Sequence, residues 1–333
     1  MAQKIAFFGT MPYDEDSFTE QNKNFGFELR FYKGNFNKNN IILTKNIDAV
    51  CIFVNDTADV ETLQLMSENG AKLLALRCAG FNNVDLDAAA KNKITVVRVP
   101  AYSPYAVAEY TVAMMLSLNR KIPRATWRTR DGNFSLHGLM GFDMHGKTAG
   151  IIGTGRIGKI LMQILRGFGM NILAYDLHPD YNFARENNIV YVTLDELYHS
   201  ADIISLHCPL TEQTKYLIND YTIGKMKDGV MIINTGRGQL LQTEALIEGL
   251  KSKKIGSAGL DVYEEEGNYF YRDRSDRFIA DDVLARLLSF NNVIVTSHQA
   301  FFTHEAMDNI AQTTLQNIKD YFSHKPLINE VKK

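Results

Sequence analysis

Three groups of reactive side chains follow apolar, strand-like segments in the second half of the sequence. Arg237 follows residues 230–234, a run of three glutamates follows Asp261, and His298 comes shortly after residues 293–296. An arginine can hold a carboxylate through two parallel hydrogen bonds, and a histidine exchanges a proton near neutral pH. A neighbouring carboxylate orients an imidazole and favours its protonated form. Together these side chains could bind a small anionic substrate and move one proton.

Each of these residues has a simpler interpretation when it is taken alone. An isolated arginine after a strand usually forms a surface ion pair, and an isolated histidine is usually structural. Asp261 could brace a turn, and a run of glutamates is typical of a solvated loop. Their joint occurrence with the glycine motif of residues 153–158 favours chemistry, because a bound redox cofactor needs a carboxylate anchor and an acid/base beside it.

The glycine motif reads Gly153-Thr-Gly155-Arg-Ile-Gly158; it follows the strand-like residues 148–152 and begins a predicted helix. The first glycine allows a tight turn, the second lets the backbone approach a pyrophosphate, and the third lets helix and strand pack closely. The first amides of the helix would face the phosphate charge. Asp176, at the end of the next predicted strand, can accept a hydrogen bond from a ribose 2′-hydroxyl and would repel a 2′-phosphate. The sequence therefore predicts NAD as the cofactor.

Apolar segments of strand length recur along the chain with helix-length segments between them, a pattern typical of buried parallel strands in α/β folds. We therefore expect two doubly wound, Rossmann-like parallel sheets with a cleft between the two domains. Ligands of such sheets bind beyond the carboxyl ends of the strands, where the three reactive groups would converge. The predicted strands are residues 5–8, 49–54, 73–76 and 94–97 in the first series, and 148–152, 172–175, 203–206, 230–234, 256–260 and 293–296 in the second.

The two series join at residues 99–104, where two prolines favour an extended crossing that we interpret as a hinge. Helices are predicted over residues 104–118 and 306–322, and periodicity alone assigns the last helix to neither domain. Arg120, Arg124 and Arg128 recur every four residues, so a helix there would carry a basic stripe, although Pro123 interrupts the pattern. We favour a solvated or subunit-contact face for the stripe, with a site for an anionic effector as the alternative.

Composition limits the partners and the compartment. The 36 lysines and arginines nearly balance the 38 aspartates and glutamates, which gives no electrostatic reason to expect a nucleic acid or a membrane as partner. The 3 cysteines are far apart and lack Cys-x-x-Cys spacing, which argues against a disulfide framework or a zinc site. We see no signal peptide and no apolar run of membrane-spanning length, and we expect a cytoplasmic protein without a metal.

At these motifs the chain resembles the D-isomer-specific 2-hydroxyacid dehydrogenase family and, within it, the bacterial fermentative D-lactate dehydrogenases. The resemblance covers essentially the whole chain and implies reversible, NADH-dependent reduction of pyruvate to D-lactate. The segments that carry it are RCAGFNNVD at 77–85, VPAYSP at 99–104, GTGRIG at 153–158, ADIISLHCP at 201–209, NTGRG at 234–238, DVYE at 261–264 and HQAF at 298–301.

The resemblance also implies roles for individual residues. Arg237 would bind the substrate carboxylate and polarise the keto group, His298 would be the acid/base, and Glu266 would pair with it. On the substrate side it implies the backbone amides of Ala79 and Gly80, the side chain of Tyr102, and Phe53 and Phe301 as walls of a small pocket. On the cofactor side it implies Gly153, Gly155, Arg156, Ile157 and Gly158 at the pyrophosphate, Asp176, Cys208, Pro209 and Thr214 on the adenosine side, and Thr235, Gly236 and Asp261 near the nicotinamide. Cys208 is interpreted as a small apolar side chain rather than a nucleophile.

The same resemblance implies a discontinuous arrangement of domains and an oligomer. Residues 1–101 with 299–333 would form the substrate domain, and residues 102–298 the NAD-binding domain. The family implies a homodimer built on the NAD-binding domains, or a homotetramer.

Two other functions stay open at this point. One is a D-2-hydroxyisocaproate-type dehydrogenase of bulkier 2-keto acids, although Phe53 and Phe301 favour a small substrate. The other is a non-enzymatic, NAD-sensing binding protein, since such proteins can retain the three reactive residues. Oxidation of NADH on addition of pyruvate would distinguish catalysis from binding.

Overall fold

The computed structural model describes residues 2–332 and divides into two compact units. Unit 1 comprises Met1–Ser103 with Phe302–Lys333, and unit 2 comprises Pro104–Phe301. The final helix therefore groups with the N-terminal part of the chain. These limits differ from the predicted domain boundaries, 1–101 with 299–333 and 102–298, by two residues at the first crossing and three at the second.

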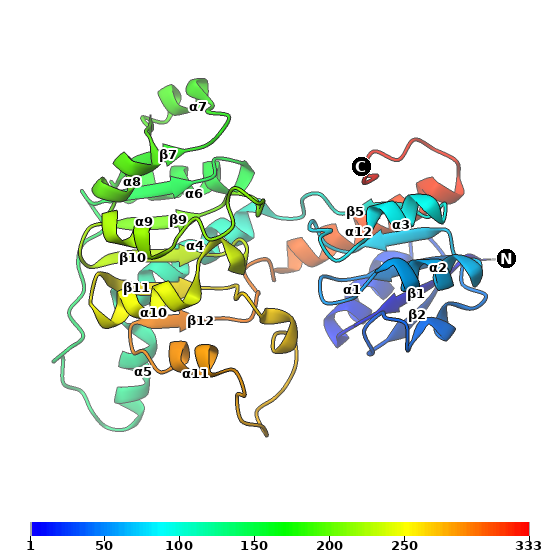
Figure 1. Cartoon of the computed structure of the whole chain (residues 1–333), viewed down its shortest axis with the longest axis horizontal. Coiled ribbons are helices and arrows are strands. Elements are labelled where there is room, and N and C mark those ends of the chain that lie inside the picture. The colour runs from blue at the N-terminus through cyan, green and yellow to red at the C-terminus, as the bar shows by residue number, and fades with distance from the viewer. Residues whose placement is uncertain (1, 333) are drawn as a thin grey trace. The chain divides into compact units, whose positions relative to one another are not determined.

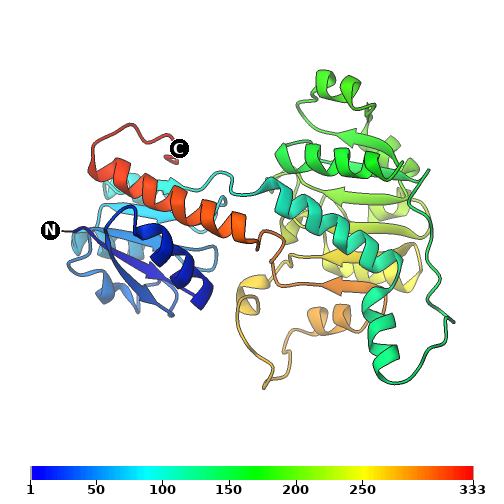
Figure 2. The ribbon, with the colours of Figure 1, turned by 180° about the vertical axis from the view of Figure 1, so that it is seen from behind.

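Unit 1 is built on a parallel sheet of five strands in the order β2-β1-β3-β4-β5 (Figure 1). The helices α2 (Val60–Glu68) and α3 (Leu86–Lys91) pack on one face of this sheet. The helices α1 (Pro12–Asn22) and α12 (His304–Phe322) lie side by side on the other face (Figure 2). The strands are β1 (Lys4–Phe8), β2 (Glu28–Tyr32), β3 (Ala49–Ile52), β4 (Leu73–Leu76) and β5 (Thr95–Arg98).

Because both faces of this sheet are covered, its inner strands are apolar on both sides. In β1 the side chain of Phe8 packs with the core under α2 and α3, while that of Phe7 lies against Phe18 of α1, with ring centroids 4.7 Å apart. The strand predicted over residues 49–54 ends at Ile52, because the Asp56 carboxylate accepts a hydrogen bond from the Phe53 amide and turns the chain. Unit 1 thus has three layers, with one sheet between two layers of helices.

Unit 2 is built on a parallel sheet of seven strands in the order β12-β11-β10-β9-β6-β7-β8 (Figure 1). The helices α4 (Pro104–Asn119) and α6 (Arg156–Gly167) cover one face, and α8 (Leu194–Ser200), α9 (Asp220–Lys225) and α10 (Thr243–Lys251) cover the other. The order of the strands reverses between β6 and β9, which is where such sheets bind ligands. The strands are β6 (Thr148–Ile152), β7 (Asn171–Tyr175), β8 (Val190–Tyr191), β9 (Ile203–Leu206), β10 (Val230–Asn234), β11 (Ile255–Leu260) and β12 (Val293–Val295).

The predicted fold class, two doubly wound parallel sheets, is confirmed, and every predicted strand is present. Two strands were not predicted, β2 and β8, and both lie at a sheet edge. Neither contains a residue that is fully buried, so neither carries the continuous apolar run that identifies an inner strand.

The spacing of the three arginines falls on one helix only in part, since the helix Ile122–Arg130 contains Arg124 and Arg128 but not Arg120. The helix α4 ends at Asn119, Lys121 adopts a left-handed backbone with φ 52°, and α5 (Ile122–Arg130) begins there with Pro123 in its first turn. Arg120 is therefore not on the same helix as Arg128. The guanidinium of Arg128 donates to the carbonyl oxygens of Ser135 and His137, each at 2.9 Å, and so holds the following loop against α5.

No helix within residues 2–332 combines the length and the hydropathy needed to span a bilayer. Over the same residues, no three histidine, cysteine, aspartate or glutamate side chains are grouped so that they could hold a metal ion.

Candidate active site

The predicted catalytic residues all lie in unit 2, on the connections that follow β10, β11 and β12. Two backbone hydrogen bonds link these connections. The amide of Asp261 donates to the carbonyl oxygen of Asn234 at 2.9 Å, and the amide of His298 donates to that of Asp261 at 2.7 Å. The pairing of the strands thus continues beyond their carboxyl ends and brings the three connections to one edge of the sheet.

His298 is paired with Glu266. Its Nδ1 atom lies 2.9 Å from Oε1 of Glu266, and the two side chains are only 16% and 21% exposed. The backbone of His298 is left-handed, with φ 53°, and is held by the Asp261 carbonyl on one side and by the hydroxyl of Tyr271, which donates to the His298 carbonyl at 2.9 Å, on the other. Since Nδ1 is engaged, Nε2 is the ring nitrogen that can exchange a proton with a ligand.

The neighbouring glutamates are engaged elsewhere or exposed. The carboxylate of Glu264 accepts from the Thr243 amide at 2.6 Å, and Glu265 is exposed. The second oxygen of Glu266 accepts from the Tyr263 amide at 3.1 Å, which orients the carboxylate toward His298. The geometry therefore brings together the two residues that the resemblance pairs, while their roles in a reaction stay predictions.

Arg237 is half-buried and retains most of its hydrogen-bonding capacity. Its Nη1 donates to the carbonyl of Gly236 at 2.8 Å, and no carboxylate in residues 2–332 lies within ion-pair distance of it. The Asn234 side chain fixes this loop, since it donates to the Arg237 carbonyl at 2.9 Å and accepts from the Gly236 amide at 3.0 Å. Gly238 is required here, because a Cβ atom would lie 2.2 Å from the carbonyl carbon of Tyr263. The arrangement leaves a guanidinium free to bind a carboxylate.

Asp261 is buried, and its carboxylate braces the segment that carries His298. It accepts from the Thr296 hydroxyl at 2.6 Å and from the amides of Gln299 and Ala300 at 2.9 and 2.8 Å. Burial raises the pKa of Asp261, although these hydrogen bonds act in the opposite direction. The structure thus supports the bracing interpretation of this residue, and a contact with the nicotinamide stays a prediction.

The glycine motif has the geometry expected for a pyrophosphate site. Gly153 has φ +96°, and a Cβ atom there would lie 2.3 Å from the backbone nitrogen of Cys208. A Cβ atom on Gly158 would lie 2.2 Å from the carbonyl oxygen of Gly153, so this glycine lets α6 pack against the turn. At Gly155, by contrast, a Cβ atom would meet no protein atom within 4 Å, and no side chain caps α6. This open space and the first amides of α6, including those of Arg156 and Ile157, fit a bound phosphate group.

Asp176 follows β7 beside this motif. One of its oxygens accepts from the backbone amide of Thr154 at 2.6 Å and from the Thr154 hydroxyl at 3.1 Å, and the other accepts from the His178 amide at 2.9 Å. Partial burial alone would raise the pKa of Asp176, but the hydrogen bonds outweigh it and the pKa is lowered. The carboxylate is therefore ionised at neutral pH.

The remaining predicted cofactor residues have mixed surroundings. Burial raises the pKa of the Cys208 thiol to about 11, which fits its interpretation as an unreactive side chain. The Thr214 hydroxyl donates to the Pro209 carbonyl at 2.7 Å and closes a turn. The buried hydroxyl of Thr235 lies 3.0 Å from that of Thr111 on α4. Roles of these residues toward a cofactor stay predictions.

Four of the predicted substrate contacts lie in unit 1. The buried Arg77 donates to the carbonyls of Phe8 and Gly9 at 3.0 and 2.9 Å, and its guanidinium lies 4.9 Å from the ring centroid of Phe53. This contact fixes the orientation of the Phe53 ring. The backbone of the other contacts is held by side chains, since Arg98 donates to Ala79 and Asn309 donates to Tyr102, and the Cys78 thiol donates to the Gly80 carbonyl.

The fifth predicted substrate contact, Phe301, is buried and is the last residue of unit 2. Its side chain is only 7% exposed.

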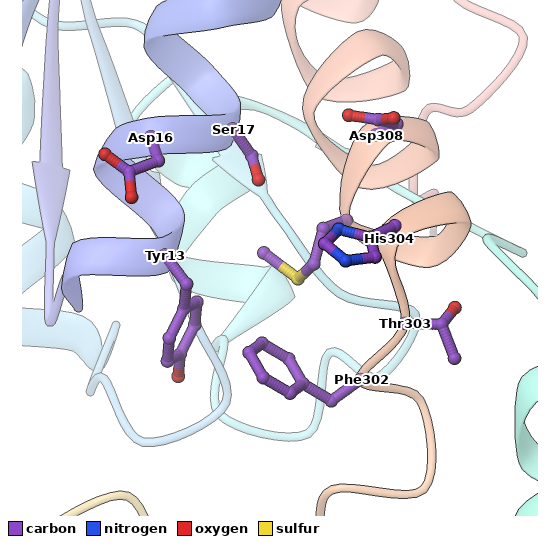
Figure 3. A pocket seen from close by; sticks show the side chains of 8 residues that line it. Tyr13, Asp16, Ser17, Phe302, Thr303, His304 and Asp308 are labelled. Atoms are coloured by element: carbon purple, nitrogen blue, oxygen red, sulfur yellow. The ribbon is translucent and has the colours of Figure 1, made fainter.

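A separate hollow of about 280 Å³ lies within unit 1, between α1 and the start of α12 (Figure 3). Figure 3 shows Tyr13 and Phe302 at one end, where their rings meet edge to face with centroids 4.7 Å apart. Asp16 and Asp308 lie on opposite sides and are exposed. The sequence did not predict this hollow.

Several residues that organise the site were missed in the sequence. Tyr271 holds His298, and Thr154 holds Asp176. No motif includes Tyr271, and the glycine motif that contains Thr154 assigns roles only to its glycines. Asn234 could have been recognised, because an asparagine at the end of a strand commonly bonds to the backbone two residues on.

Comparisons with known proteins agree with this geometry. Residues 112–300, more than half of the chain, match the family model of the D-isomer specific 2-hydroxyacid dehydrogenase, NAD binding domain. The chain is 50% identical to D-lactate dehydrogenase of Escherichia coli (strain K12), over 98% of this chain and 99% of that protein.

Solved structures extend the comparison to the whole fold. An apo structure of D-lactate dehydrogenase from Escherichia coli is similar with a TM-score of 0.91 and 48% identity, over 99% of this chain and 100% of that chain. A structure described as the pyruvate reductase of Chlamydomonas reinhardtii gives 0.93 and 42%, over 98% of each chain. A D-2-hydroxyisocaproate dehydrogenase gives 0.87 with 29% identity, over 99% of this chain and 100% of that one.

Proposed function

Since the chain belongs to the D-isomer-specific 2-hydroxyacid dehydrogenase family, we propose that it reversibly reduces pyruvate to D-lactate with NADH. The observation that carries the proposal is the His298–Glu266 pair at 2.9 Å on the same sheet edge as the unpaired Arg237. Similarity supports the substrate, because identity is 50% to the Escherichia coli D-lactate dehydrogenase and 29% to the D-2-hydroxyisocaproate dehydrogenase structure.

The cofactor is NAD, as in the family to which the chain belongs. When it is bound, NADH supplies the hydride that the keto carbon of the substrate accepts. The open space at Gly155 and the uncapped start of α6 would receive its pyrophosphate, and the ionised Asp176 would accept from its adenosine ribose.

The protein supplies the anchor and the proton. In the proposed mechanism the Arg237 guanidinium binds the substrate carboxylate with two parallel hydrogen bonds and polarises the keto group. Protonated His298 donates from Nε2 to the keto oxygen as the neighbouring carbon gains the hydride, so that one proton and one hydride convert the carbonyl to a hydroxyl. Glu266 keeps the imidazole in place through Nδ1 and stabilises its charged form. The reverse steps oxidise D-lactate.

The alternative substrate class is a bulkier 2-keto acid. The contact between Arg77 and the Phe53 ring argues for a small substrate, because a ring held by a buried cation cannot swing aside without losing that contact. A panel of pyruvate, 2-ketobutyrate, 2-ketoisocaproate and phenylpyruvate, each with NADH and with NADPH, tests substrate and cofactor together. The proposal requires the highest kcat/KM for pyruvate with NADH, and a higher value for 2-ketoisocaproate would replace it. No NADH oxidation with any of these acids would favour an NAD-sensing protein.

We propose that the enzyme is a homodimer, and the loop that follows α5 supports this. Leu136 and Met140 are 82% and 87% exposed, and Trp127 and Phe134 nearby are also largely exposed. Apolar side chains gathered in this way usually mark a protein interface. Light scattering should give the mass of a dimer, and the double variant Leu136→Asp with Met140→Asp should shift it to a monomer. A tetramer in wild type would require a second interface, and a monomer would contradict the assignment.

We also propose that the enzyme works in the cytoplasm. Cys51 is buried as a free thiol, which is typical of a reducing compartment. Fractionation of the source cells with markers for each compartment tests the proposal, and recovery of the protein outside the cytoplasm would contradict it.

A further inference from the structure

A chain of hydrogen bonds ends on Asp176, the residue to which we assign the preference for NAD. The amide of Asp180 donates to the Tyr191 oxygen at 3.2 Å, and the Tyr191 hydroxyl donates to Oγ1 of Thr154 at 2.8 Å. The Thr154 hydroxyl in turn donates to Oδ2 of Asp176 at 3.1 Å. Thr154 is buried and Tyr191 is half-buried, so water competes little for these bonds.

The last member of this relay from Asp180 through Tyr191 and Thr154 to Asp176 fixes the direction of donation. An ionised carboxylate can only accept, so the one proton of the Thr154 hydroxyl is directed to Asp176. The Thr154 oxygen therefore accepts from the Tyr191 hydroxyl, whose own oxygen accepts from the Asp180 amide. Every proton in the relay therefore points toward the carboxylate of Asp176, which must act as an acceptor.

These contacts leave the carboxylate with little freedom. Oδ2 of Asp176 accepts from the Thr154 amide and hydroxyl, and Oδ1 accepts from the His178 amide. A carboxylate has about four acceptor positions, so about one remains, and it lies on Oδ1.

We propose that Thr154 and Tyr191 determine the specificity for NAD over NADP by holding Asp176 in one orientation. The inference rests on the proposed role of Asp176 as the acceptor for the ribose 2′-hydroxyl. A carboxylate that could rotate would turn away from a 2′-phosphate and relieve part of the repulsion. Rotation of Asp176 would break the bonds from Thr154 and His178, so the repulsion is retained in full. Loss of the relay should therefore raise the affinity for ligands with a 2′-phosphate by more than it lowers the affinity for ligands with a 2′-hydroxyl.

The test uses binding of ligands that cannot react. Isothermal titration of the whole protein with ADP-ribose and with 2′-phospho-ADP-ribose gives two dissociation constants for each variant. The specificity ratio is the dissociation constant of 2′-phospho-ADP-ribose divided by that of ADP-ribose. We expect Thr154→Val to reduce this ratio by about tenfold and Tyr191→Phe by about threefold, in line with the loss of one hydrogen bond to a charged group and of one that supports it. Thr154→Ser retains the hydroxyl and should restore the wild-type ratio.

Tyr181→Phe is a matched control. The Tyr181 ring packs edge to face on that of Tyr191, with centroids 5.6 Å apart, but its hydroxyl has no place in the relay. Its ratio should equal that of wild type. If Thr154→Val does not fold, Tyr191→Phe carries the test alone, since it removes only one oxygen from a half-buried side chain.

Asp176→Asn separates the two hypotheses. If this variant keeps the wild-type ratio, the proposed role of Asp176 is wrong. If Asp176→Asn reduces the ratio while Thr154→Val and Tyr191→Phe do not, Asp176 acts without the relay and the inference is overturned. A reduced ratio in all three variants, with Tyr181→Phe unchanged, supports it.

Discussion

The Nδ1 atom of His298 lies 2.9 Å from Oε1 of Glu266, and both residues sit on connections that follow strands of the same sheet. The left-handed backbone of His298 and the amide of Tyr263 set this geometry from the two sides. The pair is the part of the candidate site whose chemistry can be examined most directly.

Glu266→Gln should lower kcat/KM for pyruvate reduction by about tenfold. A neutral amide cannot form the charge-assisted hydrogen bond that the carboxylate forms with Nδ1 of His298, so the acid/base is held less firmly. Glu264→Gln is the matched control, because Glu264 binds the Thr243 amide instead. A kcat/KM that is unchanged in Glu266→Gln, or equally lowered in both variants, would remove Glu266 from this role.

Arg237→Lys should lower kcat/KM for pyruvate by about 100-fold or more, because an ammonium cannot form the two parallel hydrogen bonds of a guanidinium. The melting temperature should hardly change, since Arg237 donates only to the carbonyl of its neighbour Gly236. Binding of NADH, followed by fluorescence, serves as the control for an intact cofactor site. Near-normal kcat/KM would contradict the assignment of the substrate carboxylate to Arg237.

Tyr271→Phe should reduce kcat by about fivefold, in line with the loss of one ordinary hydrogen bond. The Tyr271 hydroxyl holds the left-handed backbone of His298, so its loss should loosen the acid/base without touching the substrate anchor. Steady-state kinetics should therefore show a lower kcat with little change in KM. A change in KM alone would point to a contact with substrate instead.

Gly153→Ala and Gly155→Ala should fail in different ways. At Gly153 a methyl group would meet the Cys208 backbone at 2.3 Å in a residue with φ +96°, so this variant should be strongly destabilised or insoluble. At Gly155 a methyl group meets no protein atom, so the variant should keep the wild-type melting temperature but bind NADH at least tenfold more weakly. Thermal unfolding and NADH titration check both variants, and normal NADH binding by Gly155→Ala would count against a phosphate there.

His207 should make the protein less stable in mild acid. Burial lowers the pKa of His207 to about 4 from its ordinary value of 6.5, so the unfolded chain takes up a proton before the folded one does. The contribution of His207 to the free energy of unfolding is then fully present above pH 6.5, the pKa of the histidine in the unfolded chain. This contribution is lost as the pH falls toward 4, by at most about 1.4 kcal/mol per pH unit.

The free energy of unfolding, measured with urea between these pH values, should change less with pH in His207→Gln than in wild type. The bond between His207 Nε2 and the Ser205 hydroxyl, at 2.8 Å, is lost or replaced in this variant, so its stability at pH 8 sets the baseline. Equal slopes in the two proteins would mean that another group carries the acid sensitivity.

The strands could be predicted where burial of both faces produces a continuous run of apolar residues in the sequence. Inner strands such as β6 and β9 are apolar along their whole length because helices cover both faces, and their limits match the prediction. The edge strand β2 escaped because one side of it has no neighbouring strand and its residues remain partly exposed. The end of α4 was predicted at residue 118 and is observed at Asn119. The break between α4 and α5 did not show in the four-residue spacing of the arginines, because a left-handed Lys121, rather than a glycine, separates the two helices.

Part of the candidate site could also be predicted from the sequence. The glycine motif with Asp176, and the residue types at Arg237 and His298, could be predicted because each follows the carboxyl end of a strand. The contacts that orient them could not. Tyr271 reaches His298, and Tyr191 reaches Thr154, through the course of irregular loops, and nothing in the spacing of these residues specifies that course.

The helix α12 makes unit 1 depend on both ends of the chain. It packs against α1, β4 and β5, yet all of unit 2 lies between them in the sequence. During synthesis on a ribosome at about 5–20 residues per second, the 198 residues of Pro104–Phe301 (301 − 104 + 1) take roughly 10 to 40 seconds to appear. For that time α1 alone covers one face of the first sheet, while unit 2, a continuous segment, can already fold. The residues made first are thus among the last to be enclosed, and a chain whose translation stops early would be a natural target for chaperones.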